Sequence, residues 1–355
     1  MCSANCSLLV AQYSSTQRRG GFLALYMLMS GVGVLASYSL GAGLNWRVVA
    51  VFPPILYACM VMGLFAVPES PIWLLSHKTE TDARQALIWL RASDEVTKEL
   101  IILNDTRENQ EQALTVTQAI YNLSRPDIRK PFLLILFNFL FIMFAGPFVI
   151  IFYAVKILQD SGVAANAYIA AIVVEISMVV GCILSMFFIQ KVKRRTLLMV
   201  SMSSMSLSMA ALGMVLYLPE LGYDNLTIRL LPILCIMLYM FSFGAGAGPL
   251  QWVLMGELLP PEYKVLSGIL ISVSTVAIFI TTKMFLALTE VLQPYGAYWL
   301  MSGISFLANF FYATCMPETK GKSLSEIREL FLVNQKLHPN TESVVLTKSS
   351  IENIS

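Results

Sequence analysis

The sequence contains few charged residues and almost no histidine. Asp, Glu, Lys and Arg make up 13% of its 355 residues, and there are two histidines. A soluble domain has about 25% charged residues. Hydrophobic residues make up 57%, more than a soluble core of this length can bury. The formal net charge of +2 is too small to indicate a polyanionic partner such as a nucleic acid. The composition therefore excludes a soluble enzyme, a nucleic-acid-binding protein and a disordered chain, and it indicates that lipid surrounds most of the protein.

The sequence also lacks the arrangements that bind metals or cofactors. Its six cysteines are scattered, and no two of them have the spacing of a metal site or of a disulfide framework. It contains no Walker loop, no dinucleotide-binding fingerprint and no nucleophile elbow. We therefore expect no catalytic residue, no metal and no cofactor.

Long uncharged runs separated by polar breaks are the main feature that is present. A bilayer core about 30 Å thick requires about 20 apolar residues per helix. The runs of this length predict eight membrane-spanning helices, over residues 21–45, 48–67, 131–155, 163–190, 197–218, 230–256, 265–288 and 291–316. The predicted fold is an all-α, multi-pass membrane protein.

The charges between these spans predict the orientation of the chain. The loop 190–195 contains four basic residues and no acidic one, and the positive-inside rule therefore assigns it to the cytoplasm. Alternation of the spans places the polar segment 76–130 and the C-terminal tail on the same side. Asn225 opens an Asn-Leu-Thr sequon on a loop predicted to lie outside, which makes it a candidate for glycosylation.

An internal repeat divides the chain into two parts of the same orientation. The tripeptides Pro-Glu-Ser at 68–70 and Pro-Glu-Thr at 317–319 each end a pair of spans that a basic residue opens, Arg19 in one case and Lys264 in the other. Parallel repeats of this kind are typical of transporters. Projected backwards, the repeat predicts that about three and a half spans are missing before Met1. The predicted parts are the rest of an N-terminal half (1–75), a helical connector (76–130), a complete C-terminal half of six helices (131–318) and a tail (319–355).

Four short segments carry a further pattern. They read PESPIWLL at 68–75, KVKRR at 191–195, GPLQW at 248–252 with Glu257 following, and PETKG at 317–321. In this order and at this spacing they resemble the boxes of the sugar-porter branch of the major facilitator superfamily and, within it, the facilitated trehalose transporters. The resemblance covers nearly the whole chain. It implies two six-helix halves that rock around a central site, of which this chain would lack about the first three and a half of twelve helices. It also implies facilitated diffusion of trehalose or a hexose-like sugar, and the plasma membrane as the usual location.

The resemblance also implies where the transported molecule would bind. The expected substrate wall consists of Phe148, Tyr153, Glu175, Trp252 and Thr275. At the seventh-helix positions where family members often carry a Gln-Gln pair, this chain has Ile142 and Met143. Sugar hydroxyls left without partners there would cost about 1–3 kcal/mol each. A porter for an organic ion or a less polar solute is therefore the alternative.

Glu175 lies about halfway along the span 163–190, where an ionised carboxylate costs several kcal/mol unless it faces water or a partner. One interpretation is a group that couples transport to protons or recognises a cation. The other is a protonated glutamate that is hydrogen-bonded to a neighbouring helix, or one that is merely tolerated. The sequence leaves both open.

Charged residues at the inner ends of the helices predict a cytoplasmic latch. Its expected members are Arg19, Glu69, Arg194, Arg195, Glu257, Lys264 and Glu318. Opposite charges that pair when this side closes contribute about 1 kcal/mol each, so several pairs could separate two states by a few kcal/mol. The alternative is that these residues are only solvated helix ends.

A function of another class is also compatible with the sequence. A chain that lacks part of one half could be a non-transporting remnant that associates with a full-length relative and regulates it. Apart from such a relative, the expected partners are a small-molecule substrate and the lipid bilayer.

Overall fold

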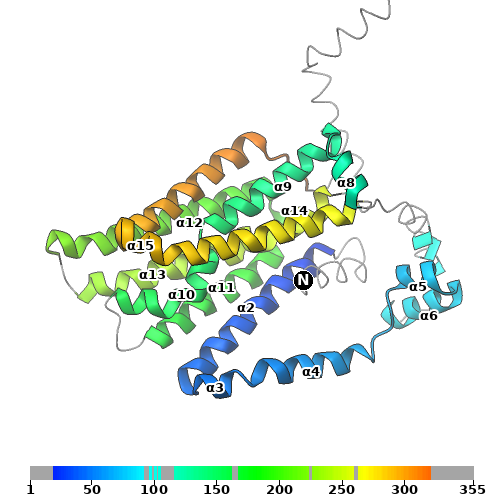
Figure 1. Ribbon diagram of the computed structural model, residues 1–355, viewed down its shortest axis with the longest axis horizontal. Coiled ribbons are helices and arrows are strands. Elements are labelled where there is room, and N and C mark those ends of the chain that lie inside the picture. Colours follow the sequence, from blue (N-terminus) through cyan, green and yellow to red (C-terminus); the bar gives the residue numbers. More distant parts are fainter. Residues whose placement is uncertain are drawn as a thin grey trace, which may run out of the picture.

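The computed structural model describes residues 19–91, 96–97, 100–101, 103–104, 116–161, 167–223, 226–259 and 263–320. Within these ranges the chain folds into helices and contains no strand (Figure 1). The first helices are α2 (Arg19–Gly43), α3 (Trp46–Val49), α4 (Phe52–Leu64), α5 (Pro71–His77), α6 (Glu80–Arg91) and α8 (Val116–Asn122). They are followed by α9 (Pro126–Phe144), α10 (Pro147–Asp160), α11 (Ala167–Lys191), α12 (Arg194–Tyr217), η2 (Leu218–Leu221), α13 (Leu226–Ser242), η3 (Phe243–Ala247), α14 (Gly248–Leu258) and α15 (Lys264–Cys315).

Seven of the helical runs in the described part of the chain are long and apolar enough to cross a membrane. The last of them, Val265–Cys315, has 51 residues. At 1.5 Å per residue it is about 77 Å long, more than twice the thickness of a bilayer core. Its helical geometry is broken at Gln293, which has φ 60° and ψ 162° and precedes Pro294. This run therefore corresponds to two of the eight predicted spans, and the predicted multi-pass, all-α class is confirmed.

Two of the predicted spans are interrupted within the bundle. Between α9 and α10, Gly146 has φ +94°, and a Cβ atom there would lie 2.6 Å from the sulfur of Met301. Only glycine fits this position without strain. Between α13 and α14 the helix η3 has π geometry. In this region Gly244 packs against the backbone carbonyl of Met178 on α11, where a side chain would clash.

Small polar side chains join the helices of the bundle from α9 to α15. The hydroxyl of Ser201 on α12 donates to the carbonyl of Ser242 on α13 at 2.7 Å, and Ser302 on α15 donates to the carbonyl of Ser206 at 2.7 Å. Small residues let helices approach closely and hydrogen-bond across their contact, which favours association where lipid supplies no hydrophobic driving force. The Met-rich stretch of α12 lies in the same core.

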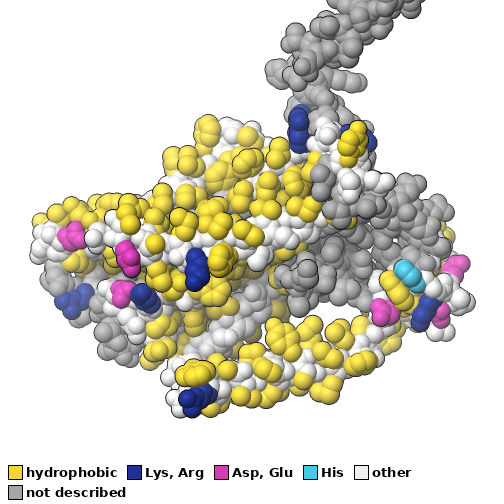
Figure 2. Space-filling model, viewed as in Figure 1, with side chains coloured by type: hydrophobic (Ala, Val, Ile, Leu, Met, Phe, Trp, Pro, Cys, Tyr) yellow, Lys and Arg dark blue, Asp and Glu magenta, His cyan; other side chains and the backbone are white. Residues whose placement is uncertain are grey.

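The N-terminal helices differ in how they pack. α2 packs against α11 and α14 of the bundle, whereas α3 and α4 contain no buried residue. α4 runs away from the bundle, and hydrophobic side chains cover its visible surface (Figure 2). α5 and α6 form a separate small core that includes Leu74, Leu75 and Leu87. The predicted division at residue 75 falls inside α5. We call the end of the bundle where α5, α6 and α8 lie the connector side.

Candidate functional site

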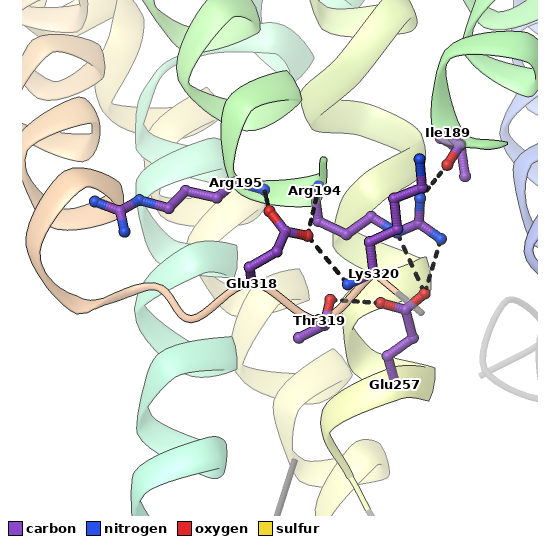
Figure 3. A network of polar contacts seen from close by, with 7 residues as sticks. All are labelled: Ile189, Arg194, Arg195, Glu257, Glu318, Thr319 and Lys320. Atoms are coloured by element: carbon purple, nitrogen blue, oxygen red, sulfur yellow. Dashed lines mark hydrogen bonds and ion pairs between the residues drawn. The ribbon is translucent and has the colours of Figure 1, made fainter. Parts of the chain in front are cut away.

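A network of polar contacts joins the ends of four helices on the connector side (Figure 3). Arg194 is the first residue of α12, and Glu257 lies in the last turn of α14. The Nη2 and Nε atoms of Arg194 donate to Oε1 of Glu257 at 3.1 and 3.3 Å, and Nη1 donates to the carbonyl of Ile189 near the end of α11. The other carboxylate oxygen of Glu257 accepts a hydrogen bond of 2.7 Å from the hydroxyl of Thr319. Every oxygen of the Glu257 carboxylate is therefore paired.

Glu318, which follows α15, occupies the amino end of α12. Its Oε1 accepts hydrogen bonds of 3.0 Å from the backbone N–H groups of Arg194 and Lys320, and its Oε2 accepts one of 3.4 Å from the N–H of Arg195. The first N–H groups of a helix have no partner inside the helix, and its positive dipole end favours a carboxylate. Glu318 thus caps α12 from a segment far away in the sequence.

Two further contacts tie the segment after α15 to the α11–α12 turn. The ammonium group of Lys320 donates to the carbonyl of Lys191 at 2.6 Å, and the guanidinium of Arg195 points away from the carboxylates and donates to the carbonyl of Ala313 (Figure 3). The side chains of Arg194 and Glu257 are 11% and 28% exposed, so water screens their attraction only in part. All these residues belong to 189–320, and the network therefore holds one half of the predicted repeat together.

Three further residues were predicted to belong to the latch. Arg19 begins α2 and Lys264 begins α15, but their side chains lie outside the part of the structure that is described. Glu69 is exposed between α4 and α5 and makes no hydrogen bond or ion pair with the described residues. Asn225 also lies outside the described residues. The roles of Thr319 and Lys320 were missed, because the sequence does not show the backbone path that brings this segment to α11 and α14.

A second group of polar atoms is buried inside the bundle and has no hydrogen-bond partner among the described residues. These atoms are Asn138 Nδ2, Glu175 Oε1, Gln251 Oε1, Trp252 Nε1 and Thr282 Oγ1. A buried polar group without a partner costs about 1–3 kcal/mol. Such groups in a native structure call for an explanation, and ligand binding is one.

Trp252 lies where three segments meet. Its ring packs edge-on against Tyr26 of α2, with centroids 5.4 Å apart, and against Phe139 of α9 at 5.7 Å. Trp252 is 9% exposed, while its indole N–H has no acceptor. Gln251, the preceding residue, is 1% exposed and also has an unpaired oxygen. Trp252 was predicted from the sequence, but its aromatic neighbours were missed, because only the packing of α2 and α9 brings them together.

Tyr153 faces the first part of α15. Its ring stacks on Phe285, with centroids 5.6 Å apart, and its hydroxyl donates to the carbonyl of Thr282 at 3.5 Å. Thr275 lies two helical turns before Thr282 and hence on the same face of α15. Thr275 is exposed, and its hydroxyl donates to the carbonyl of Ile271 in its own helix at 2.8 Å. Tyr153 and Thr275 thus line one face of α15, while Phe148 is half-buried against the core of the bundle.

Glu175 lies between α11 and α2. It is 1% exposed, and a Cβ atom on Gly31 of α2 would lie 3.7 Å from its Oε1 atom. Trp252 and Glu175 therefore both contact α2, near residues 26 and 31. The buried groups offer hydrogen-bond donors and acceptors rather than a nucleophile, and the described residues contain no cluster of His, Cys, Asp or Glu suited to a metal. This chemistry fits recognition of a polar molecule without covalent reaction.

Comparison with known proteins gives a consistent result. The model of the family described as "Sugar (and other) transporter" matches residues 1–331. The facilitated trehalose transporter Tret1 of Drosophila mojavensis is 30% identical over 314 residues, which are 87% of this chain and 36% of that protein. The facilitated trehalose transporter Tret1-2 homolog of Drosophila sechellia is 30% identical over 311 residues, 87% of this chain and 64% of that protein. The chain thus spans between 36% and 64% of the length of these two relatives.

Solved structures resemble the chain as well. The proton:xylose symporter XylE bound to 6-bromo-6-deoxy-D-glucose matches with a TM-score of 0.75 at 20% identity, over 93% of this chain and 70% of that one. A partially occluded, inward-open conformation of the xylose transporter XylE from E. coli matches with a TM-score of 0.70 at 21% identity, over 90% of this chain and 68% of that one.

Proposed function

Because the chain belongs to the sugar (and other) transporter family and has the major facilitator fold, we propose that it carries a sugar-like solute across a membrane. In this proposal the solute crosses with alternating access, by facilitated diffusion where no ion gradient is imposed, and no covalent bond is made or broken. The similarity to transporters named for trehalose supports a sugar such as trehalose or a hexose-like molecule.

The observation that carries this proposal is the unpaired indole N–H of Trp252. It lies among aromatic rings, on a contact between α2 and the bundle. An aromatic face packs against the C–H groups of a sugar ring, and an indole N–H donates to a hydroxyl oxygen. Gln251 Oε1 and Thr282 Oγ1 add an acceptor and a hydroxyl that have no partner. With Tyr153, Thr275 and Phe148, these groups form the proposed substrate wall.

The packing of α2 suggests how the site would open. Tyr26 and Trp252 lie on opposite sides of the boundary between the two predicted halves. If the halves rock, this ring contact separates and exposes the indole. The Arg194–Glu257–Glu318 network supports such a movement, because it fastens the ends of α11, α12, α14 and α15 so that the C-terminal half moves as one body. In this proposal the network, the connector and the C-terminal tail face the cytoplasm, and the membrane is the plasma membrane.

Uptake by the purified full chain in proteoliposomes tests the proposal. Labelled trehalose and labelled glucose are offered to the wild type, to Trp252→Phe and to Trp46→Phe. The first variant keeps a ring but loses the buried N–H, whereas Trp46 is 75% exposed on α3. We expect Trp252→Phe to weaken solute binding about tenfold, as expected for one lost hydrogen bond to a buried donor. The Trp46→Phe variant should behave as the wild type. Absence of uptake of either sugar by the wild type would refute the proposal and would favour the non-transporting partner of a full-length relative.

A less polar solute is a second candidate. Ile142 is fully buried and Met143 is 3% exposed, so neither offers a hydrogen-bonding group on this part of α9. A solute with few hydroxyls would avoid the cost of leaving them unpaired there. Competition for uptake between trehalose and a deoxy sugar distinguishes the two, because only the second candidate predicts that the deoxy sugar competes better.

A further inference from the structure

Glu175 is a buried carboxyl group that the proposed sugar site does not use. It lies near the middle of α11, on the face that packs against α2. Gly31 of α2 passes directly over it, because a Cβ atom at that position would meet Glu175 Oε1 at 3.7 Å, Met178 Cε at 3.5 Å and Val179 Cγ2 at 3.3 Å. The carboxyl is thus covered by backbone and by apolar side chains, and its Oε1 atom has no hydrogen-bond partner.

No cation faces Glu175 from the described parts of the helices around it. The titratable groups within electrostatic reach are Tyr38 on α2 and Cys182 on α11 itself, and both are uncharged at neutral pH. The hydroxyl of Tyr38 donates to the carbonyl of Ile151 rather than to the carboxyl. On α13, the hydroxyl of Tyr239 donates to the carbonyl of Ala145, and Cys235 is half-buried.

The charged residues of the other neighbouring helices lie farther away. Lys156 and Asp160 are exposed in the last two turns of α10. Arg194 and Arg195 of α12 and Glu257 of α14 lie in the connector-side network. That network begins where α11 ends at Lys191, about 24 Å along the helix from Glu175.

The surroundings of Glu175 determine its charge. An ionised carboxylate without a partner in such a place costs several kcal/mol, whereas a protonated carboxyl does not. With α2 packed against α11, the group is therefore neutral and holds a proton. Once α2 moves away and water reaches it, a glutamate ionises at neutral pH. Closing the α2–α11 contact takes up one proton and opening it releases one.

We propose that Glu175 is a proton-binding site whose occupancy follows the closing of α2 against α11, so that the carrier couples solute movement to a proton gradient. The coupling rests on the proposed transport function, while the proton site itself does not. One proton binds a carboxylate oxygen and leaves it again, and no other bond changes. The coupled ligand is thus a proton, in addition to the solute bound near Trp252.

Solute accumulation in proteoliposomes under an imposed pH difference tests the coupling. One coupled proton per solute shifts the equilibrium ratio of inside to outside solute by about tenfold per pH unit. We expect the wild type to approach such a ratio, with the solute accumulating on one side of the membrane or the other according to whether it moves with the proton or against it. We expect Glu175→Gln to equilibrate the solute to a ratio near one. Glu290→Gln is the matched control, because Glu290 is exposed on α15, and it should behave as the wild type. A wild-type ratio near one, or equal ratios in the wild type and Glu175→Gln, would overturn the coupling.

Alkylation of Cys182 tests the proton site without any transport. Cys182 lies on α11 two turns after Glu175 and is fully buried, whereas Cys59 on α4 is exposed. Both are labelled in one sample of the full chain with a membrane-permeant maleimide and quantified by mass spectrometry at several pH values. Dividing the rate at Cys182 by that at Cys59 removes most of the intrinsic pH dependence of thiols.

The two proposals fail in different ways. We expect the Cys182/Cys59 ratio to rise severalfold with pH in the wild type, because ionisation of Glu175 opens the contact, and to stay flat in Glu175→Gln. Identical profiles would overturn the proton site. If no solute is taken up at any pH but the profiles differ, the transport function falls and the proton site stands. A third outcome would also overturn the proposal. If the wild type takes up a labelled organic cation, Glu175→Gln does not, and the pH difference has no effect, then Glu175 binds the transported cation and not a coupled proton.

Discussion

Glu257 and Glu175 are two carboxyl groups at the contacts of the same bundle, and their surroundings are opposite. Glu257 lies at the end of α14, where Arg194 and Thr319 satisfy both of its oxygens. Glu175 lies between α2 and α11, where its Oε1 atom has no partner. A carboxylate at a partly solvent-exposed helix end is stabilised in its ionised form by its partners. A carboxyl inside the membrane without partners stays protonated, because its ionised form would be costly to bury. Glu257 therefore helps to hold the C-terminal half together, whereas the charge of Glu175 depends on whether α2 is packed against α11.

The largest effect is expected from removing Arg194, the cation that pairs with Glu257. Arg194→Ala leaves Oε1 of Glu257 without its donors and frees the carbonyl of Ile189. We expect a loss of about 3 kcal/mol of stability, at the low end for breaking a buried pair because Glu257 is partly exposed. Thermal unfolding of the purified protein in detergent measures it. Lys193→Ala, an exposed position one residue away, is the control and should change little. Equal losses in both variants would show that the network adds no stability.

A smaller effect is expected from adding a side chain to the contact between α2 and α11, beside Glu175. A Cβ atom added at Gly31 would meet Val179 and Glu175, whereas one added at Gly33 would meet nothing within 4 Å. Gly31→Leu therefore crowds the contact, and Gly33→Leu is its control. Overpacking of a contact costs about 1–3 kcal/mol, and it should move α2 away from α11 and let reagents reach Cys182. We expect severalfold faster alkylation of Cys182 in Gly31→Leu and an unchanged rate in Gly33→Leu. The same rate in both would mean that α2 does not cover this part of α11.

These two regions also differ in how far they could be predicted from the sequence. Arg194, Glu257 and Glu318 stand out because charge is rare in this chain and recurs in short boxes, but the same pattern also selected Glu69, which is exposed and lies outside the network. Their partners Thr319 and Lys320 could not be selected in this way, because their bonds depend on the path of the chain after α15. The spans followed from the lengths of the apolar runs. Gly146 interrupts one of them for a reason that lies on another helix, at Met301, which a reading of one segment at a time does not include.

Neutralising each carboxyl in turn tests the comparison directly. Glu257→Gln loses the charge that attracts Arg194 and should cost about 1–2 kcal/mol, toward the low end for hydrogen bonds to a charged group because Glu257 is partly exposed. Glu175→Gln replaces a group that is already neutral in the closed arrangement, so we expect its stability at neutral pH to stay within about 0.5 kcal/mol of the wild type. Thermal unfolding of both variants across a range of pH measures the difference. A larger loss in Glu175→Gln than in Glu257→Gln would contradict the contrast between the two sites.

Among the residues around Glu257, the smallest effect is expected at Thr319, which contributes a single hydrogen bond. Thr319→Val keeps the shape of the side chain but removes the hydroxyl that donates to Glu257 Oε2 at 2.7 Å. Thr319 is 2% exposed, so water does not readily replace the lost donor, and we expect a cost of about 1 kcal/mol. Thr319→Ser keeps the hydroxyl and should recover most of it. In the Glu257→Gln background the cost of Thr319→Val should shrink, because the acceptor is no longer charged. Additive losses in the double variant would mean that the hydroxyl stabilises the segment after α15 independently of Glu257, and that the carboxylate is held by Arg194 alone.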